Sequence, residues 1–172
     1  MGGNHMTALP STSIPDLRER PRCRYLIDCA GAQLHVHARS PATVLRVDGE
    51  IDASNAHLLA QAIRRFSQLK APLILDLSQL DFLGVVGLRA LIALNHEHQQ
   101  AKLHCNVVSG PALRRLTHVV SDHGLPIVDS VPEALQLIED AINARRTLLS
   151  GQARQQEPQR KTPTTRVIGI PY

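Results

Sequence analysis

The stretch that decides the fold is Leu73–Leu94, which reads LILDLSQLDFLGVVGLRALIAL. It opens with five residues that are apolar except for Asp76, a run typical of a strand that is covered on both faces or lies centrally in a sheet. From Gly84 to about Gln99, apolar residues recur at helical spacing. The residues expected to face inward in that helix are Val85, Leu88, Leu91 and Ile92. The stretch therefore predicts a buried strand followed directly by a helix.

Further strands are expected on both sides of this stretch. Alternating and β-branched residues predict strands over residues 33–37 and 43–47, the first of them at a sheet edge and paired antiparallel with the second. The acidic and glycine-containing segment 48–52 is expected to break the second strand. Apolar runs over residues 103–108 and 126–128 predict two more strands.

Helices are expected between these strands. An apolar stripe over residues 59–69 predicts one helix, with Asp52 as its N-cap. A second is expected to start at Pro111 and end at Gly124. A third follows Ser130-Val131-Pro132-Glu133, which forms a capping box, and reaches Arg146. The resulting order β-β-α-β-α-β-α-β-α predicts an α/β fold with a mixed, mostly parallel sheet.

The two ends of the chain differ in composition from its middle. Residues 1–30 are rich in Pro, Ser, Thr and Arg, and residues 149–172 are polar and contain Pro. We expect a flexible N-terminal arm (1–30), one globular domain (31–148) and a flexible basic C-terminal tail (149–172). The net charge is +4 with much of the Arg and Lys surplus near the ends, and aromatic residues make up only 2%. Solvated basic ends explain this better than nucleic-acid binding, which commonly uses stacking rings.

The sequence carries no pattern that predicts catalysis or a bound cofactor. The three cysteines form neither a disulfide framework nor a zinc motif. The pairs His35/His37 and His96/His98 lack the i, i+4 spacing with which a helix binds zinc. No apolar run approaches the roughly 18 residues of a membrane helix. We therefore expect a cytoplasmic protein that is not an enzyme, with no catalytic residues, cofactor, metal, membrane partner or direct nucleic-acid partner.

A family resemblance rests on residues 73–94 together with Val47-Asp48-Gly49-Glu50-Ile51-Asp52. These segments resemble the centre of STAS domains, and the order of elements agrees from about Gln33 to Arg146. The family usually has an apolar strand ending in Asp-Leu-Ser and then Phe-Ile-Asp-Ser-Ser-Gly-Leu at a helix start. The resemblance is to bacterial anti-sigma factor antagonists. It implies a transcription regulator that binds a kinase-type anti-sigma factor and is released when the kinase phosphorylates a Ser or Thr at that helix start.

The chain departs from the family at the phosphorylated position. Gly84 replaces the Asp, and Val85 and Val86 replace the two hydroxyl residues. Valine has no oxygen that could accept a phosphoryl group, so we expect a switch position that cannot be phosphorylated and an apolar turn that contacts the partner. The candidate partner-binding residues are Asp52, Ser54, Asn55, Leu83, Gly84, Val85, Val86, Gly87 and Arg89.

Three alternatives stay open. Val85 and Val86 could simply pack in a domain that has lost its partner. The helix start could bind a nucleotide or another small ligand, because helix N-termini attract anions. The domain could be a scaffold subunit that assembles with other STAS proteins or with itself. Hydroxyl residues near the ends, Ser11–Ser13 and Thr162–Thr165, could carry the regulation that the valines cannot.

Overall fold

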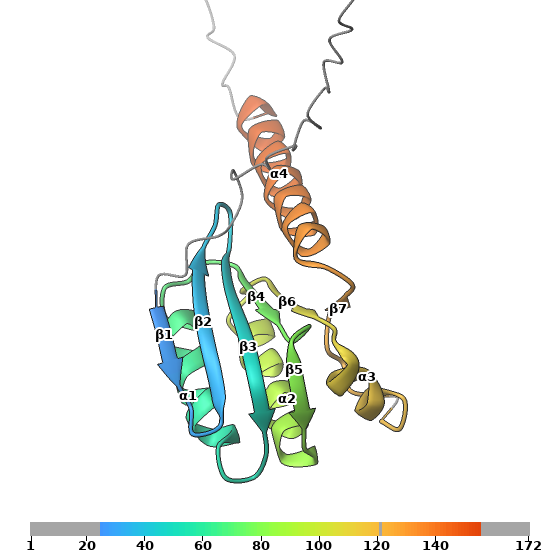
Figure 1. The fold of residues 1–172 in the computed structure, drawn as a ribbon. Helices are drawn as coiled ribbons and strands as arrows, with labels where there is room; N and C mark the ends of the chain where they lie inside the picture. The colour runs from blue at the N-terminus through green and yellow to red at the C-terminus, as the bar shows by residue number, and fades with distance from the viewer. Residues whose placement is uncertain (1–24, 121, 156–172) are drawn as a thin grey trace, which may run out of the picture.

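The structure is a computed structural model that describes residues 25–120 and 122–155. The hydroxyl residues near both ends of the chain, and most of the expected arm and tail, lie outside these ranges. Seven strands and four helices form one α/β unit (Figure 1). The strands are β1 (Tyr25–Asp28), β2 (Ala32–Ala38), β3 (Thr43–Ile51), β4 (Leu73–Asp76), β5 (Leu80–Leu83), β6 (Cys105–Val108) and β7 (Ile127–Val128). The helices are α1 (Ala56–Ser67), α2 (Val85–Gln100), α3 (Pro111–Thr117) and α4 (Val131–Gln155).

The sheet is mixed, as the sequence predicts. Its strand order is β1-β2-β3-β4-β6-β7, and β5 pairs separately with the end of β3. The β1–β2 and β2–β3 pairs are antiparallel, whereas β3–β4, β3–β5, β4–β6 and β6–β7 are parallel. The parallel strands therefore end at the same side of the sheet, and helices α1 and α2 begin there (Figure 1).

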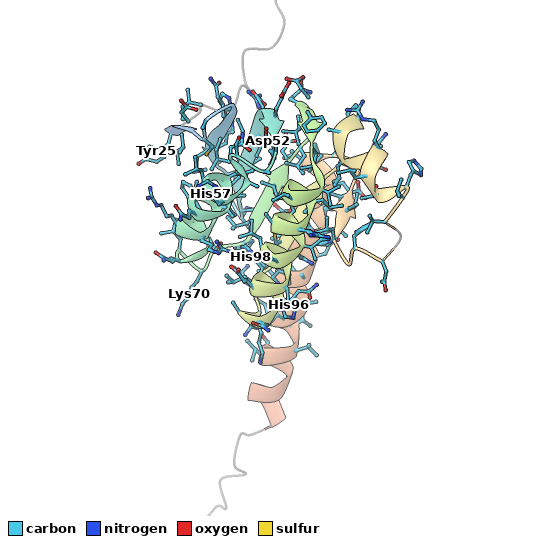
Figure 2. All side chains as sticks on the ribbon, turned by 90° about the horizontal axis from the view of Figure 1, so that it is seen from below. Tyr25, Asp52, His57, Lys70, His96 and His98 are labelled. Atoms are coloured by element: carbon cyan, nitrogen blue, oxygen red, sulfur yellow. The ribbon has the colours of Figure 1, made fainter. Side chains whose placement is uncertain are left out.

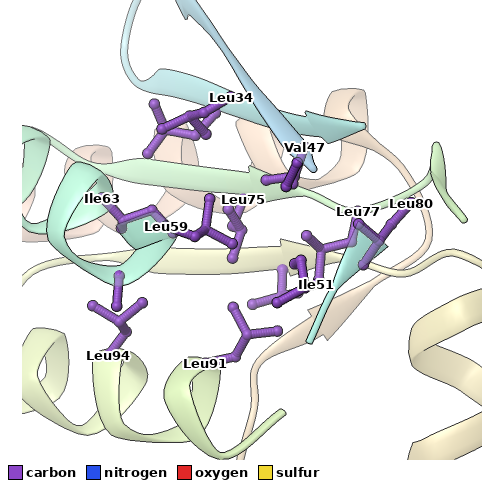
Figure 3. Packing of buried hydrophobic residues seen from close by; sticks show 14 of the residues in the cluster. Leu34, Val47, Ile51, Leu59, Ile63, Leu75, Leu77, Leu80, Leu91 and Leu94 are labelled. Atoms are coloured by element: carbon purple, nitrogen blue, oxygen red, sulfur yellow. The ribbon is translucent and has the colours of Figure 1, made fainter. Parts of the chain in front are cut away.

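One face of the sheet is buried beneath α1 and α2. Alternate strand residues, such as Leu45 and Val47 in β3, point to this face and are fully buried. They meet the apolar stripes of the two helices, including Leu59 and Leu91 (Figure 3). Fully burying an aliphatic side chain of this size contributes about 1.5–3 kcal/mol, so this cluster dominates the stability of the domain.

Helix α4 covers part of the opposite face. Its residues Ala134 and Ile138 are buried against a second apolar cluster that includes Val44 and Ile74. The helix begins close to the predicted capping box. The Ser130 hydroxyl accepts a hydrogen bond from the Glu133 N–H (3.3 Å), but the Glu133 carboxylate accepts from Asp129 N–H (2.9 Å) instead of the Ser130 N–H. The rest of α4 projects past the end of the sheet (Figure 1).

Two strands were missed by the sequence analysis. Strand β1 lies inside the segment 1–30 expected to be a flexible arm, and it makes β2 an interior strand, so the edge-strand prediction for residues 33–37 was wrong. Tyr25 and Leu26 of β1 are exposed and Ile27 alone among its apolar residues is partly buried against the core, so pairing with β2 defines this strand more than burial does. Strand β5 has only four residues, which is too short to show a clear period.

Three element boundaries also differ from the expectation. Strand β3 continues through the segment 48–52 as far as Ile51, because Gly49 adopts φ 90° and a register shift against β5 absorbs the irregularity. Helix α3 ends at Thr117, well before Gly124. Helix α4 continues to Gln155, past the expected domain end at 148.

Candidate partner-binding surface

The first turn of α2 lies beside the loop that joins β3 to α1. Gly84 is the N-cap of α2, and its N–H donates to the carbonyl oxygen of Ile51, the last residue of β3, at 2.7 Å. The Gly84 carbonyl then accepts from the Leu88 N–H at 3.0 Å. This short backbone bond holds the helix start against the loop, so residues of the two segments share one surface at the carboxyl end of the parallel strands.

The two valines of this turn are exposed. Val85 is 57% and Val86 46% accessible, and Phe82, just before the turn, is 47% accessible. The prediction that Val85 faces inward was wrong, because the inward positions of the first turns are taken by Gly87, Leu88 and Leu91. Phe82 was absent from the predicted set, although its ring borders Gly84. The result is an exposed apolar patch formed by Phe82, Val85 and Val86, hereafter the valine patch.

Leu83 and Gly87, which belong to the predicted set, are buried under this patch. Leu83 is 4% accessible, and Gly87 packs directly against it. A β-carbon placed on Gly87 would lie 2.7 Å from Cγ2 of Ile51 and 2.8 Å from Cδ1 of Leu83. Both distances are shorter than van der Waals contact allows. Leu83 and Gly87 therefore support the valine patch from below. They are not themselves accessible to a partner.

Polar groups border the valine patch on the loop side. The Asp52 carboxylate oxygen Oδ1 accepts from the Ser54 N–H (2.7 Å) and from the Ser54 hydroxyl (2.5 Å). Hydrogen bonds from the Ser54 hydroxyl and then from its backbone hold the pKa of Asp52 below the usual value. Asp52 was expected to cap α1, but the N-cap is Asn55. Asp52 and Ser54 are both exposed, as is Arg89 on the next turn of α2.

Asn55 is buried at 2% accessibility and holds the loop in place. Its Oδ1 accepts from the Asp52 N–H at 2.9 Å. Its Nδ2 donates to two carbonyl oxygens, those of Ala30 (3.1 Å) and Glu50 (2.8 Å). The side chain thus joins the β1–β2 turn, the end of β3 and the loop. Of the predicted contact residues, Asn55 is therefore a positioning residue and is not accessible to a partner.

His35 in β2 and His98 in α2 take part in ordinary polar contacts. His35 Nε2 in β2 lies 3.1 Å from the Asp48 carboxylate in the neighbouring strand β3. Arg46 Nε, also in β3, lies 3.1 Å from the same carboxylate. His98 is buried, with Nε2 2.8 Å from the Ser67 hydroxyl. Within residues 25–120 and 122–155, no group of three or more His, Cys, Asp or Glu side chains is arranged to hold a metal ion.

The described cysteines are not arranged for thiol chemistry. Cys29 is buried, and burial raises the pKa of its thiol, with the Asp28 carboxylate as a second cause. Cys105 in β6 is partly covered, and desolvation raises the pKa of its thiol to about 12. A thiol with such a pKa is almost entirely protonated at neutral pH and is therefore a poor nucleophile. In the described part of the chain, no helix has both the length and the apolar character to span a membrane.

The described residues form a small α/β domain with a mixed sheet and an exposed apolar turn at the carboxyl end of its parallel strands. The chain belongs to the STAS domain family, whose profile matches residues 33–133. It is similar to Osmosensory protein A of Mycobacterium tuberculosis, with 34% identity over 128 residues that cover 72% of this chain and 81% of that protein.

Solved structures show the same relationship. The structure is similar to that of an anti-sigma factor antagonist from Mycobacterium paratuberculosis, with a TM-score of 0.55, 34% identity, and coverage of 63% of this chain and 94% of the other. An RsbS variant from Moorella thermoacetica matches with a TM-score of 0.53 at 14% identity, over 64% of this chain and 97% of the other, and this likeness concerns the fold alone. The predicted family and fold class are confirmed.

Proposed function

We propose that this protein is an anti-sigma factor antagonist that works by docking to a kinase-type anti-sigma factor through the valine patch and the neighbouring Asp52–Ser54 loop. The family supports the kind of activity, since a similar structure is that of an anti-sigma factor antagonist. The observation that carries the proposal is the exposure of Val85 and Val86 at the start of α2. Apolar side chains gathered on the surface are a feature of protein interaction sites.

The composition of the surface fits a protein partner better than a small ligand. Phe82, Val85 and Val86 form its apolar centre, and Asp52, Ser54 and Arg89 provide polar groups around it. An apolar centre with a polar rim is the usual build of a protein interface. Residues 84–88 contain no basic or hydroxyl side chain with which to bind a phosphate group.

The same residues make docking independent of phosphorylation at this turn. Phosphorylation of a docking surface adds about −1.5 to −2 charges and opposes a close apolar contact. Val85 and Val86 cannot carry that modification, so the surface remains competent whenever the domain is folded. The hydroxyl next to it, that of Ser54, is engaged with the Asp52 carboxylate. We infer that control of this antagonist acts elsewhere, on its amount, on its partner or on another part of the chain.

Binding to purified kinase-type anti-sigma factors from the source organism tests the proposal. The variant Val86→Asp places a charge in the centre of the patch, which lowers affinity at least about a hundredfold if that centre becomes buried in the complex. The fold should tolerate it, because a carboxylate in the first turn of a helix interacts favourably with the helix dipole. The matched control is Leu137→Asp on α4, where an apolar residue is similarly exposed (48% against 46%).

The binding of the two variants shows whether the valine patch is the docking surface. Loss of binding in Val86→Asp with retention in Leu137→Asp supports the docking surface. Equal binding by both variants, or no anti-sigma factor that binds the wild-type protein, overturns the proposal. Restoring a hydroxyl with Val85→Ser or Val86→Ser tests the regulatory half: we expect the bound kinase to phosphorylate at least one of these variants and to leave the wild-type turn unmodified, which peptide mass spectrometry detects.

A further inference from the structure

A second surface, rich in positive charge, lies at the other end of the sheet. A pocket of about 310 Å³ opens between α4 and the loops that lead into β4 and β6. Four of its lining residues are fully cationic: Lys70, Lys102, Arg145 and Arg146. Among the described residues that line it, none is Asp or Glu. We call this pocket the basic groove. Figure 2 shows Lys70 and α4 on the lower side of the molecule and Asp52, which borders the valine patch, on the upper side.

The two lysines have an unusual backbone conformation. Lys70 follows the end of α1 and Lys102 follows the end of α2, and both have φ 54°. This left-handed conformation after a helix favours glycine, and a residue with a β-carbon adopts it at a cost. Residues kept in such a conformation are concentrated at functional sites. Lys70 and Lys102 thus adopt a costly backbone conformation at two equivalent helix ends, and both residues line the same groove.

The floor of the groove is apolar. Leu103 and Ile142 are half-buried there, and Leu149 on the next turns of α4 is 60% exposed. The described residues of the lining include no Phe, Tyr or Trp on which a nucleic-acid base could stack, and His104 is the aromatic side chain among them. A nucleic-acid backbone would leave the aliphatic floor unused, and a membrane surface would not enter a concave pocket. A peptide that carries carboxylates with aliphatic side chains between them matches both features, because the carboxylates pair with the cations at the rim and the aliphatic side chains pack on the apolar floor.

We propose that the basic groove binds an acidic peptide segment of a partner protein, with aliphatic side chains on Leu103 and Ile142 and carboxylates on the lysines and arginines. The segments of this chain outside the structure do not match this chemistry, because residues 1–24 and 156–172 each contain more Arg and Lys than Asp and Glu. The groove and the valine patch lie at opposite ends of the sheet. The domain thereby has two docking surfaces, and the second stands independently of the anti-sigma factor interaction.

The probe is a library of random 12-residue peptides built from Asp, Glu, Lys, Leu, Ile, Ser and Gly, selected on the immobilised full chain. We expect enrichment of peptides that combine several Asp or Glu with at least one Leu or Ile. Their affinity should fall about tenfold or more in Lys70→Gly/Lys102→Gly and in Arg145→Gln/Arg146→Gln, since each ion pair contributes modestly and the four act together. The affinity should also fall steeply with added salt.

The glycine variant distinguishes binding from a structural role. If the lysines serve only to stabilise the helix ends, binding does not change in Lys70→Gly/Lys102→Gly. Glycine relieves the left-handed backbone, so this variant is expected to remain folded and its thermal midpoint to stay within a few degrees of the wild type. The matched control is Arg65→Gln/Arg115→Gln, which removes two exposed cations outside both the groove and the valine patch and should leave affinity unchanged.

Three results would overturn the proposal. The first is a selection without enrichment of acidic residues. The second is equal affinity for wild-type and groove variants. The third is tighter, lysine-dependent binding of a 12-nucleotide single strand or of anionic phosphatidylserine vesicles, which would assign the groove to nucleic acid or to a membrane. A failure here leaves the anti-sigma factor proposal untouched, because Val86→Asp does not alter the groove.

Discussion

The β3–α1 loop and the first turn of α2 lie side by side, yet they are held in different ways. The loop is fixed by polar groups: the buried Asn55 amide joins three backbone sites, and Asp52 is bonded to Ser54. The α2 turn has no side-chain cap and is held by one backbone bond from Gly84 and by the close packing of Gly87. The polar segment thus supplies a rigid frame, and the apolar segment supplies the surface that a partner would cover.

This difference explains how an apolar patch is kept exposed. Val85 and Val86 cannot turn inward, because Gly87 leaves no space between the helix and Ile51. They also cannot be shielded by the loop, because Asn55 fixes its course. Substitutions in the two segments should therefore affect stability to different extents.

Asn55→Ala should have the largest effect on stability. It removes a buried amide and leaves the Asp52 N–H and the carbonyl oxygens of Ala30 and Glu50 without that partner. We expect a loss of about 2–4 kcal/mol in the free energy of unfolding, measured by urea denaturation. The exposed neighbour provides the control: Ser54→Ala should stay within about 0.5 kcal/mol. Similar losses in both variants would show that Asn55 is not the anchor of the loop.

Gly87→Ala should destabilise the α2 turn by a smaller amount. At an unhindered helical site this change stabilises by about 1 kcal/mol, so the sign of the effect is informative. Overpacking against Ile51 and Leu83 costs about 1–3 kcal/mol, and we expect a net loss of about 1 kcal/mol. The comparison is Ala93→Gly at an exposed site of the same helix, which should lose about 1 kcal/mol through helix propensity alone. A gain in stability for Gly87→Ala would contradict the packing described above.

Gly84→Asp should stabilise the protein slightly. Gly84 has φ −81° and ψ 165°, an extended conformation that Asp adopts readily, and its position is the N-cap of α2. A carboxylate there can accept from the free N–H groups of the first turn, which is worth a few tenths of a kcal/mol over glycine. A rise in the thermal midpoint of a degree or two is expected. A fall would indicate that the Asp52 carboxylate next to the turn repels the added charge.

The Asp52–Ser54 contact should give the smallest effect, a pH dependence. Because the pKa of Asp52 is lowered in the folded protein, its contribution is present above the unfolded value of about 3.8 and is lost as the pH falls through the folded pKa. The stability difference between wild type and Asp52→Asn should therefore shrink as the pH is lowered from about 6 to about 3. In a Ser54→Ala background this pH dependence should diminish. An unchanged pH dependence would show that Ser54 does not hold the carboxylate.

The sequence was most informative where residues repeat with a period, and least where contacts are not local. The run 73–94 predicted the central strand, the helix α2 and the family. The expectation that Val86 is exposed came from the family resemblance, which places it at the position of a phosphorylated hydroxyl residue, and Val86 is 46% accessible. Asn55 was misjudged, since a small polar residue in a loop resembles a surface residue until its distant partner Ala30 is known. Gly87 was predicted to contact the partner, and only the packing shows that it is confined against Ile51 and Leu83.

The missed strand β1 makes the same point. Its residues Tyr25–Asp28 show no apolar alternation, and their strand is defined by hydrogen bonds to β2. Pairing of this kind depends on the partner strand and leaves no mark on the composition of the segment. The alternative functions, a nucleotide sensor and a scaffold subunit, stay predictions of the sequence that thermal-shift and gel-filtration measurements can decide.

A map of backbone amide chemical shifts in the full chain, recorded with and without the anti-sigma factor that binds it, tests whether the valine patch is the docking surface. If the valine patch is the docking surface, the largest changes fall on residues 52–54 and 82–89, and they disappear with the Val86→Asp variant. Changes concentrated on α4 or on β1, with residues 82–89 unaffected, would contradict the account.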